Sequence, residues 1–388
     1  MVGADSGTVL VVGGEPCAFA AALALCEGGV AVHHVYPQPL GLLGSSRDIG
    51  LAYPELGEPW ERLAHALGGE IALEYHRWSS RGIADLLARF PEQLRKGSRL
   101  SVSRSESESK LMSDDALQRS KPPVEDLVRL MSGAAASNYA PIDGADMASF
   151  ETGAVSFVPV KTLEAAQESL SAFPGYQGWH PDVDSWGEAE VVKGEAAIAV
   201  RGSGWSYGAG DLCLVAAGLE TRTLLGRFSS ILLPLAGQAF RTPPLKECAR
   251  SSVVGLSAGW GSERYRFDDE LRLLGCGISP RQSFQQGTNV DQKAMKVLLE
   301  RAAQLFTDFE GEAEQTMQWA VEFTGTCDGL PLLGALPGEP RIQVATGFGA
   351  SAWSRGWEAG LSVAAAIRGQ AENLLLGRCS PGRFLRVR

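Results

Sequence analysis

The stretch Val9-Leu10-Val11-Val12-Gly13-Gly14-Glu15-Pro16-Cys17-Ala18 decides the fold class of this chain of 388 residues. Its apolar run shows no alternation, which is typical of a strand covered on both faces of a parallel sheet. A helix rich in small residues is predicted from about Pro16 to Glu27, with Gly28-Gly29 as its stop signal. A second strand is expected from Val30 to Tyr36. Together these segments predict a βαβ unit with a glycine turn before its helix.

The composition is that of an ordinary globular protein, with 45% hydrophobic and 21% charged residues. A formal net charge of -10 argues against a nucleic-acid partner. No apolar run is long enough to span a membrane, and no basic region precedes the first strand, so we expect a cytoplasmic protein without a signal peptide. Seven scattered cysteines and five histidines predict reduced thiols, with neither a metal site nor a disulfide framework.

Beyond the βαβ unit, the pattern predicts two kinds of sheet. Strands of a parallel sheet are expected at Leu212–Val215, ending in Ala216-Ala217-Gly218, and at Ile342–Ala345. Alternation from Leu233 to Ile278 predicts antiparallel strands. Further predictions are helices at Glu58–Gly68, Gly82–Lys96, Glu106–Leu117, Val290–Phe309 and one ending near Arg368, an exposed strand at Arg99–Ser105 with Leu100 and Val102 on one face, and a hairpin at Glu188–Val200. We therefore expect a parallel-sheet domain of residues 1–95, 190–230 and 325–388, with an inserted antiparallel domain of residues 96–189 and 231–324.

The glycine turn departs from the dinucleotide-binding pattern G-x-G-x-x-G. Glu15 stands where the second glycine lets the backbone approach a pyrophosphate, and Ala18 is a tolerated substitute for the third. Two unit charges about 4 Å apart repel by roughly 4 kcal/mol at an effective dielectric of 20. Glu15 therefore weakens nucleotide binding unless it turns outward and serves the helix start. Tyr36 stands where an acid usually holds the ribose, so the motif alone also allows a βαβ unit that binds no nucleotide.

Five separated segments resemble the D-amino-acid-oxidase superfamily, which includes glycine, sarcosine and gamma-glutamylputrescine oxidases. Thr326-Cys327-Asp328-Gly329-Leu330-Pro331-Leu332-Leu333-Gly334 is similar to the family's T-P-D-G-L-P-L-I-G. The other segments are Gly44–Gly50, Leu214–Gly218, Tyr265–Gly275 and Val344–Ala352. The resemblance implies an α/β fold, in which a Rossmann-like FAD-binding domain of the glutathione-reductase type carries an inserted, mainly antiparallel β substrate domain.

The resemblance also implies non-covalent FAD and assigns site residues. The cofactor-binding candidates are Gly13, Gly14, Glu15, Ala18, Tyr36, Ser45, Ser46, Arg47, Ala217, Gly218, Asp328, Gly329, Gly347, Phe348, Gly349 and Ala350. Tyr265 and Arg266 are catalytic candidates because their strand borders the family's substrate cavity; solvent-facing strand residues are the alternative. Trp353 is a third candidate, with helix-start packing as its alternative. We interpret Cys327 as a small buried thiol rather than a flavin attachment site.

The function implied is FAD-dependent oxidation of a C–N bond to an imine. Relatives that bind free amino acids hold the carboxylate with an arginine shortly before T-P-D, but the stretch Trp319–Gly325 has Phe323 and no arginine. We therefore expect a small-molecule amine, or a modified or carrier-linked amino acid, as substrate. Glu15, Tyr36, Ala350 and Ala352 favour the alternative of a degenerate fold without FAD, acting as a partner subunit, scaffold or non-redox catalyst.

Overall fold

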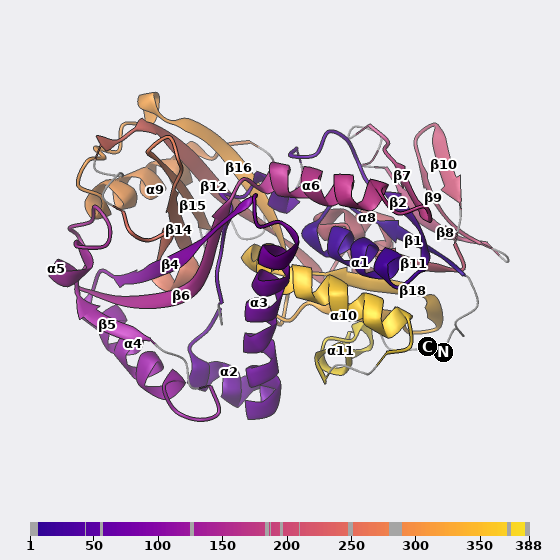
Figure 1. Ribbon diagram of the computed structural model, residues 1–388, viewed down its shortest axis with the longest axis horizontal. Helices are drawn as coiled ribbons and strands as arrows, with labels where there is room; N and C mark the ends of the chain where they lie inside the picture. Colours follow the sequence, from indigo (N-terminus) through magenta and orange to yellow (C-terminus); the bar gives the residue numbers. More distant parts are fainter. Residues whose placement is uncertain are drawn as a thin grey trace. The chain divides into compact units, whose positions relative to one another are not determined.

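The computed structural model describes residues 7–42, 44–54, 57–124, 128–182, 186, 188–194, 197–208, 210–246, 251–278, 289–370 and 374–384. The chain divides into two compact units, and each is built from separate parts of the sequence (Figure 1). Unit 1 consists of Met1–Arg47, Pro159–Leu235 and Glu322–Arg388, and unit 2 of Asp48–Val158 and Ala236–Val321. Two of the four boundaries fall within strands, β12 (Leu232–Pro244) and β16 (Met317–Thr326).

Unit 1 contains a six-stranded sheet in the order β17-β18-β11-β1-β2-β7. Its strands are β1 (Thr8–Val12), β2 (Ala31–Val35), β7 (Tyr176–Trp179), β11 (Leu212–Val215), β17 (Leu332–Leu336) and β18 (Glu339–Thr346). All neighbouring pairs are parallel except β17 with β18. The prediction that Ile342–Ala345 shares a sheet with Val9–Val12 is therefore confirmed.

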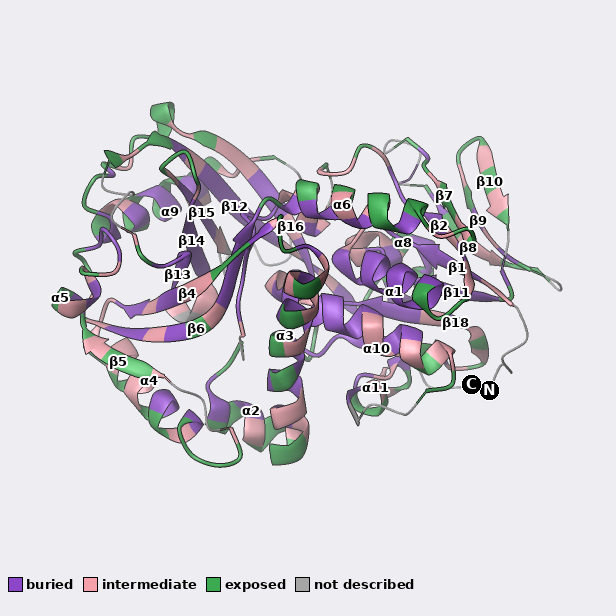
Figure 2. Cartoon of the chain, viewed as in Figure 1, coloured by how far each residue is buried: buried purple, intermediate pink, exposed green. Residues whose placement is uncertain are grey.

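Helix α1 (Pro16–Glu27) begins and ends where the sequence predicts, with Pro16 in its first turn. Every residue from Pro16 to Cys26 is buried, which Figure 2 shows as an unbroken purple helix. Helix α10 (Trp357–Ile367) packs against it, and a Cβ at Gly360 would lie 2.3 Å from the Cys17 carbonyl oxygen. Helix α6 (Pro159–Ser171) also contacts α1. The small side chains of α1 therefore allow the neighbouring helices to pack closely against it.

Unit 2 is built on a sheet in the order β16-β12-β15-β14-β13-β4-β6-β3, with β5 beside β6. Its further strands are β3 (Leu51–Ala52), β4 (Leu94–Ser103), β5 (Arg129–Ser132), β6 (Met147–Phe157), β13 (Gly255–Ala258), β14 (Glu263–Phe267) and β15 (Arg272–Ile278). Neighbours are antiparallel apart from the parallel pair β4 and β13. Helix α9 (Gln292–Leu305) belongs to an apolar cluster with Leu100, Leu256 and Tyr265.

Unit 2 also contains helices α2 (Trp60–Leu67), α3 (Gly69–Arg89) and α4 (Glu106–Arg119). The helix predicted for Gly82–Lys96 is corrected, because α3 ends at Arg89 and the residues from Leu94 to Lys96 belong to strand β4. Buried residues of α3 recur at helical spacing only up to Leu86, and strand alternation begins at Leu94. Leu100 and Val102 do share a face, but the strand is not exposed, since Arg99 on the other face is only 7% exposed.

The expected hairpin at Glu188–Val200 corresponds to β8 (Glu190–Lys193) and β9 (Ile198–Gly202), which pair with β10 (Trp205–Gly208) in a small sheet of unit 1. The unit boundaries differ from the expected domain boundaries by a few residues at 231–235 and 322–324, which belong to unit 1, and by longer stretches in two places. Residues 48–95 belong to unit 2 because β3 pairs with β6 and β4 begins at Leu94, and residues 159–189 belong to unit 1 because β7 pairs with β2.

Gly13 sets the distance between the end of β1 and the end of β11. Its φ is +132°, and a Cβ there would lie 2.2 Å from the Ala216 carbonyl oxygen and 2.6 Å from Ala217 Cα. We expect Gly13→Ala to lower the free energy of unfolding by about 3 kcal/mol or more, because backbone atoms cannot give way. Urea denaturation measures this loss. Gly29→Ala is the control, since Gly29 has φ +78° but open space around it; an equal loss in both variants would contradict the clash.

Candidate functional sites

The first candidate site lies where parallel strands of unit 1 end. β1 leads into Gly13-Gly14, β11 into Ala216-Ala217-Gly218 and β18 into Gly347, all at one edge of the sheet. This edge, with the N-terminus of α1, is where open α/β sheets bind nucleotides. Glu15 occupies the N-cap position of α1 and points inward. Its carboxylate accepts hydrogen bonds from the Ser45 hydroxyl and, at 3.4 Å, from the Ser45 N–H.

The loop carrying Ser45 is held by Trp353. This loop forms a 3-10 turn, Gly44–Arg47, and the Trp353 indole Nε1 donates to the Ser45 carbonyl oxygen at 3.0 Å. Trp353 is buried within the π-helical turn Ala352–Gly356. Its indole N–H is therefore engaged by the backbone of unit 1, which agrees with the packing role given as its alternative, and its catalytic role stays a prediction.

A second carboxyl group lies near Glu15. Burial, followed by the charges of Glu15 and Glu322, raises the pKa of Glu220 to about 8. Burial also raises the pKa of Glu15, against the lowering effect of its hydrogen bonds with Ser45. A Cβ at Gly218 would lie 2.9 Å from Glu15 Oε1, so the carboxylate also fills the space beside the end of β11. The edge of the sheet is therefore acidic as well as crowded.

Two small pockets of about 20 Å³ each are both lined by Glu15. One is also lined by Ser45, Gly218, Glu322, Phe323, Thr324, Ala345, Thr346, Gly347, Phe348, Gly349 and Ala352. The other is also lined by Gly14, Pro37, Pro39, Leu40, Gly41, Ser46, Trp186, Ala217 and Glu220. The structure thus gathers most of the expected cofactor-binding residues around Glu15.

Other expected cofactor-binding residues serve the fold. Ala18 is buried in α1, and Tyr36 packs edge-on against Phe19 and His180. Asp328 accepts hydrogen bonds from Arg383, at 2.8 Å, and from the Thr326 hydroxyl, so it shapes the turn that contains Gly329. Arg47 and Ala350 are not among the residues that line either small pocket.

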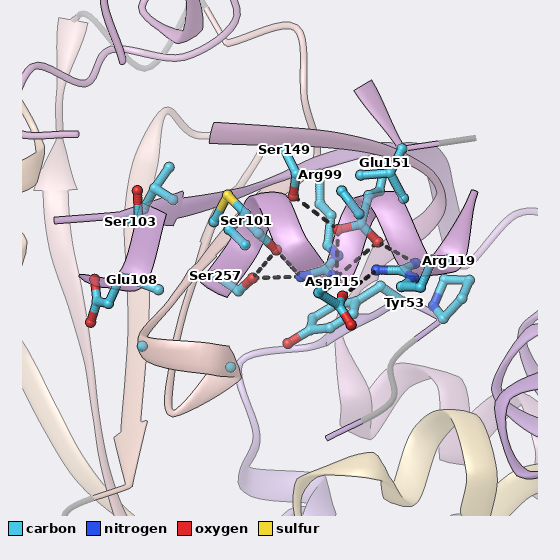
Figure 3. A pocket seen from close by; sticks show the side chains of 18 of the residues that line it. Tyr53, Arg99, Ser101, Ser103, Glu108, Asp115, Arg119, Ser149, Glu151 and Ser257 are labelled. Atoms are coloured by element: carbon cyan, nitrogen blue, oxygen red, sulfur yellow. Dashed lines mark hydrogen bonds and ion pairs between the residues drawn. The ribbon is translucent and has the colours of Figure 1, made fainter. Parts of the chain in front are cut away.

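The second candidate site is a polar pocket of about 80 Å³ in unit 2 (Figure 3). Arg99 on β4 donates from Nη2 to both carboxylate oxygens of Glu151 on β6, at 3.1 and 3.2 Å. Arg119, at the end of α4, donates to the same carboxylate at 3.0 Å. The Arg99 guanidinium lies 3.8 Å from the centre of the Tyr53 ring and also donates to the Ser257 hydroxyl. One buried carboxylate therefore joins two buried guanidinium groups.

The two buried carboxyl groups of this pocket have opposite pKa shifts. Burial acts to raise the pKa of Glu151, but the charges of Arg99 and Arg119 outweigh it and the pKa is lowered. For Asp115 burial prevails and raises the pKa, although it accepts the Trp60 N–H at 2.7 Å and lies 3.6 Å from Arg119. Of these two buried carboxyl groups, Asp115 is therefore the one whose protonation is favoured by its surroundings.

The lining of the pocket carries a net negative charge. Its acidic residues are Glu58, Glu108, Asp115 and Glu151, and its basic residues are Arg99 and Arg119, so four carboxylates face two guanidinium groups. The remaining polar lining includes the hydroxyls of Ser101, Ser103, Ser149 and Ser257. Such a pocket favours a cation with hydrogen-bonding capacity over an anion.

Tyr265 and Arg266 lie outside this pocket, and both are buried rather than solvent-facing. Tyr265 is part of the apolar cluster under α9, and its hydroxyl donates to Glu263 at 2.9 Å. Arg266 donates from Nε to the Ile49 carbonyl oxygen. The catalytic roles of Tyr265 and Arg266 stay predictions. Sequence reasoning did not single out Arg99, Arg119 or Glu151. Arg99 lies between apolar residues on a strand that the sequence predicts as exposed, whereas Arg119 and Glu151 lie on α4 and β6 and carry no such signal.

The cysteine predictions have mixed outcomes. Among the described residues Cys17, Cys26, Cys213, Cys276 and Cys379 are buried free thiols, as expected of reduced cysteines. Cys327 is also free but exposed, which corrects the expectation of a buried thiol, and Cys248 lies outside the described residues. Within the part of the chain that the structure describes, no cluster could hold a metal ion, and no helix could cross a membrane.

A glycine turn at the strand ends of a parallel sheet, together with an inserted antiparallel sheet, defines the class of two-domain nucleotide-dependent oxidoreductases. The chain belongs to the FAD dependent oxidoreductase family known as DAO, whose sequence model matches residues 8–366. No curated protein matches the chain in a sequence search.

Three solved structures show the same fold. Glycine oxidase from Geobacillus kaustophilus is 18% identical with a TM-score of 0.79, covering 98% of this chain and 100% of that one. L-proline dehydrogenase from P. horikoshii is 14% identical with a TM-score of 0.77, covering 98% of each chain. Iminodiacetate oxidase from Chelativorans sp. BNC1 is 16% identical with a TM-score of 0.75, covering 96% of this chain and 98% of that one.

The residues of unit 1 do not fit the diphosphate of FAD as they are folded. In this class of fold the N-terminus of the first helix receives the diphosphate, and here the Glu15 carboxylate, held by Ser45, lies beside that end of α1. Each neighbouring pocket of about 20 Å³ has room for about one water molecule. The family is FAD-dependent, and these residues leave no space for a diphosphate where they stand.

A substitution of Glu151 tests the ion pairs in the pocket of unit 2. We expect Glu151→Gln to lower the free energy of unfolding by about 3 kcal/mol, because two buried guanidinium groups lose their shared charge partner. Urea denaturation of the purified protein measures this. Asp114→Asn is the matched control, because Asp114 is exposed on the same helix as Asp115 and Arg119. A loss for Glu151→Gln no larger than that of the control would contradict the charge network.

Glu220 predicts a pH dependence of stability. Its pKa is raised from 4.5 to about 8, so folding retains a proton that the unfolded chain releases between these values. The free energy of unfolding therefore falls as the pH rises from 4.5 to 8, by up to about 1 kcal/mol per pH unit from this group. We expect Glu220→Gln to flatten this slope in denaturation series at several pH values, and exposed Glu190→Gln to leave it unchanged. Parallel slopes for wild type and Glu220→Gln would contradict the prediction.

Proposed function

We propose that the chain oxidises the C–N bond of an amine, or of a modified or carrier-linked amino acid, to an imine. Membership of the FAD dependent oxidoreductase family supports oxidation as the reaction class. The solved structures with this fold include oxidases and a dehydrogenase that act on glycine, iminodiacetate and L-proline, according to their names. All of these compounds contain a C–N bond beside a hydrogen-bearing carbon, which is the bond that such an oxidation converts to C=N.

The acidic pocket of unit 2 carries the proposal of an amine substrate. An ammonium group finds carboxylates there, and the excess of acidic over basic residues disfavours a free carboxylate ligand. The stretch Trp319–Gly325 supports the same substrate class, because the sequence resemblance expects a carboxylate-binding arginine there and the stretch has none; Phe323 within it is buried on β16. Neither candidate site therefore offers an uncommitted guanidinium group to a free amino acid: Arg99 and Arg119 are both engaged by Glu151.

Asp115 is the residue we propose to recognise the amine. It lies in the pocket lining, and burial holds its pKa above the ordinary value, so the carboxyl group gains most from a new positive partner. Its backbone contact with Trp60 and its position on α4 fix the direction of the carboxyl group. The Ser101 and Ser257 hydroxyls, 2.9 Å apart, supply further hydrogen-bonding groups in the same lining.

A second candidate function is favoured by Glu15. A chain that fills its own diphosphate position is suited to act without FAD, as a partner subunit, scaffold or non-redox catalyst.

We also propose a cytoplasmic location, because a reducing compartment keeps thiols free. The free thiols are those of Cys17, Cys26, Cys213, Cys276, Cys327 and Cys379.

We expect a diamine such as putrescine to bind more tightly than glycine, sarcosine or D-alanine, because only the diamine lacks a carboxylate. Isothermal titration calorimetry on the purified protein measures this without any need for turnover. Asp115→Asn removes the charge but keeps an oxygen for the Trp60 N–H, and we expect it to weaken diamine binding about tenfold, or roughly 1.4 kcal/mol. Asp114→Asn is the control that should bind as the wild type does.

The reaction itself is tested by anaerobic reduction of flavin in protein supplied with FAD. Reduction by amines, and little by free glycine or D-alanine, is the expected result. Rapid reduction by glycine or D-alanine would contradict the proposed substrate class. No reduction by any compound of the panel, in a protein shown to hold FAD, would favour the second candidate function.

A further inference from the structure

We infer that the Glu15 carboxylate is an internal anion in the diphosphate position of the fold, so that FAD binds this chain only by displacing it. The inference rests on the proposed function only in naming FAD as the displacing ligand. The contacts of Glu15, the glycines around it and the surrounding charges support it independently.

Glu15 is the N-cap residue of α1, and its carboxylate is held by Ser45 rather than by the N–H groups of the first helical turn. The first turn of α1 contains no acidic residue of its own, so Glu15 at the N-cap supplies the carboxylate for this end of the helix dipole. The carboxylate is not turned to solvent, because both of its oxygens accept hydrogen bonds from Ser45. Trp353 in turn holds the Ser45 carbonyl oxygen. The side chain is therefore hydrogen-bonded to the loop Gly44–Arg47, which Trp353 holds in place.

Two glycines make room for this side chain. A Cβ at Gly44 would lie 1.7 Å from Glu15 Oε1, and a Cβ at Gly218 would lie 2.9 Å from the same atom. Both glycines have positive φ, +53° and +56°. In this fold class, glycines near the helix start allow a phosphate to approach the backbone. Here the space that these two glycines leave is taken by the chain's own carboxylate.

The carboxylate of Glu15 itself opposes a second anion. Of the titratable groups beside it, Glu220, whose pKa Glu15 and Glu322 help to raise to about 8, and the Cys17 thiol, whose pKa Glu15 also helps to raise, are mainly protonated at pH 7 and offer no compensating positive charge. A diphosphate brought beside Glu15 would therefore place like charges close together. Moving Glu15 out of the position removes both the overlap and the nearest charge, which is why displacement and FAD binding are coupled.

The test compares FAD binding by the full-length wild type, Glu15→Gln, Glu15→Gly and the control Glu27→Gln, at pH 7. Glu27 is exposed at the other end of α1, so its substitution leaves the site intact. Quenching of FAD fluorescence reports affinity. We expect Glu15→Gly to bind FAD at least about tenfold more tightly than the wild type. Glu15→Gln, which removes the charge but keeps the bulk, should fall between the two, and Glu27→Gln should match the wild type.

A smaller probe separates this inference from the proposed function. Inorganic pyrophosphate should raise the melting temperature of Glu15→Gly and leave that of the wild type unchanged, whatever reaction the protein catalyses. Equal affinity of the wild type and both Glu15 variants for FAD, with no effect of pyrophosphate on Glu15→Gly, would overturn the inference. Tight FAD binding by Glu15→Gly without amine oxidation would instead leave the inference standing and count against the proposed function.

Discussion

The close approach of β1 to β11 is the constraint on which unit 1 depends. Gly13 lets the two strand ends come within a distance that no side chain would allow, and its carbonyl oxygen lies 2.9 Å from the buried His34 ring nitrogen. The chain then enters α1 at the edge where parallel strands end. This course of the chain places Glu15 at the ends of the parallel strands, where it lines the two small pockets.

The buried carboxyl groups of Glu151 in unit 2 and of Glu15 and Glu220 in unit 1 have different partners, and their pKa values shift in opposite directions. In unit 2, Glu151 is stabilised by two guanidinium groups, so its pKa is lowered despite burial. In unit 1, Glu15 has only hydrogen bonds from Ser45, and Glu220 lies near further negative charge, so both pKa values are raised. A buried carboxylate without a cationic partner is costly, and such groups are concentrated at functional sites. Here the carboxyl groups without a cationic partner, Glu15 and Glu220, lie at the ends of the parallel strands, where folds of this class bind a nucleotide.

The sequence predicts the βαβ unit well because strong local signals agree: an apolar run, a proline at the helix start and glycines at its end. It also locates Glu15 as the departure from the nucleotide pattern. It does not predict the pocket of unit 2, because Arg99, Glu151 and Arg119 lie on separate elements and meet only through strand pairing. The burial of Tyr265 could not be predicted for the same reason: alternation along a strand gives two faces, and only the packing of α9 shows which face is the core.

The order of strands in unit 1 has a consequence for biosynthesis. β11 pairs with β18, and α1 is covered by α10, yet both partners come from the last part of the sequence to be translated. Until they emerge from the ribosome, β11 has one unpaired edge and α1 exposes an apolar side. Unit 2 contributes its second segment in the meantime. The nascent chain therefore carries an incomplete sheet, with an unpaired strand edge, from the synthesis of β11 until that of β18, and such an edge favours aggregation during this interval.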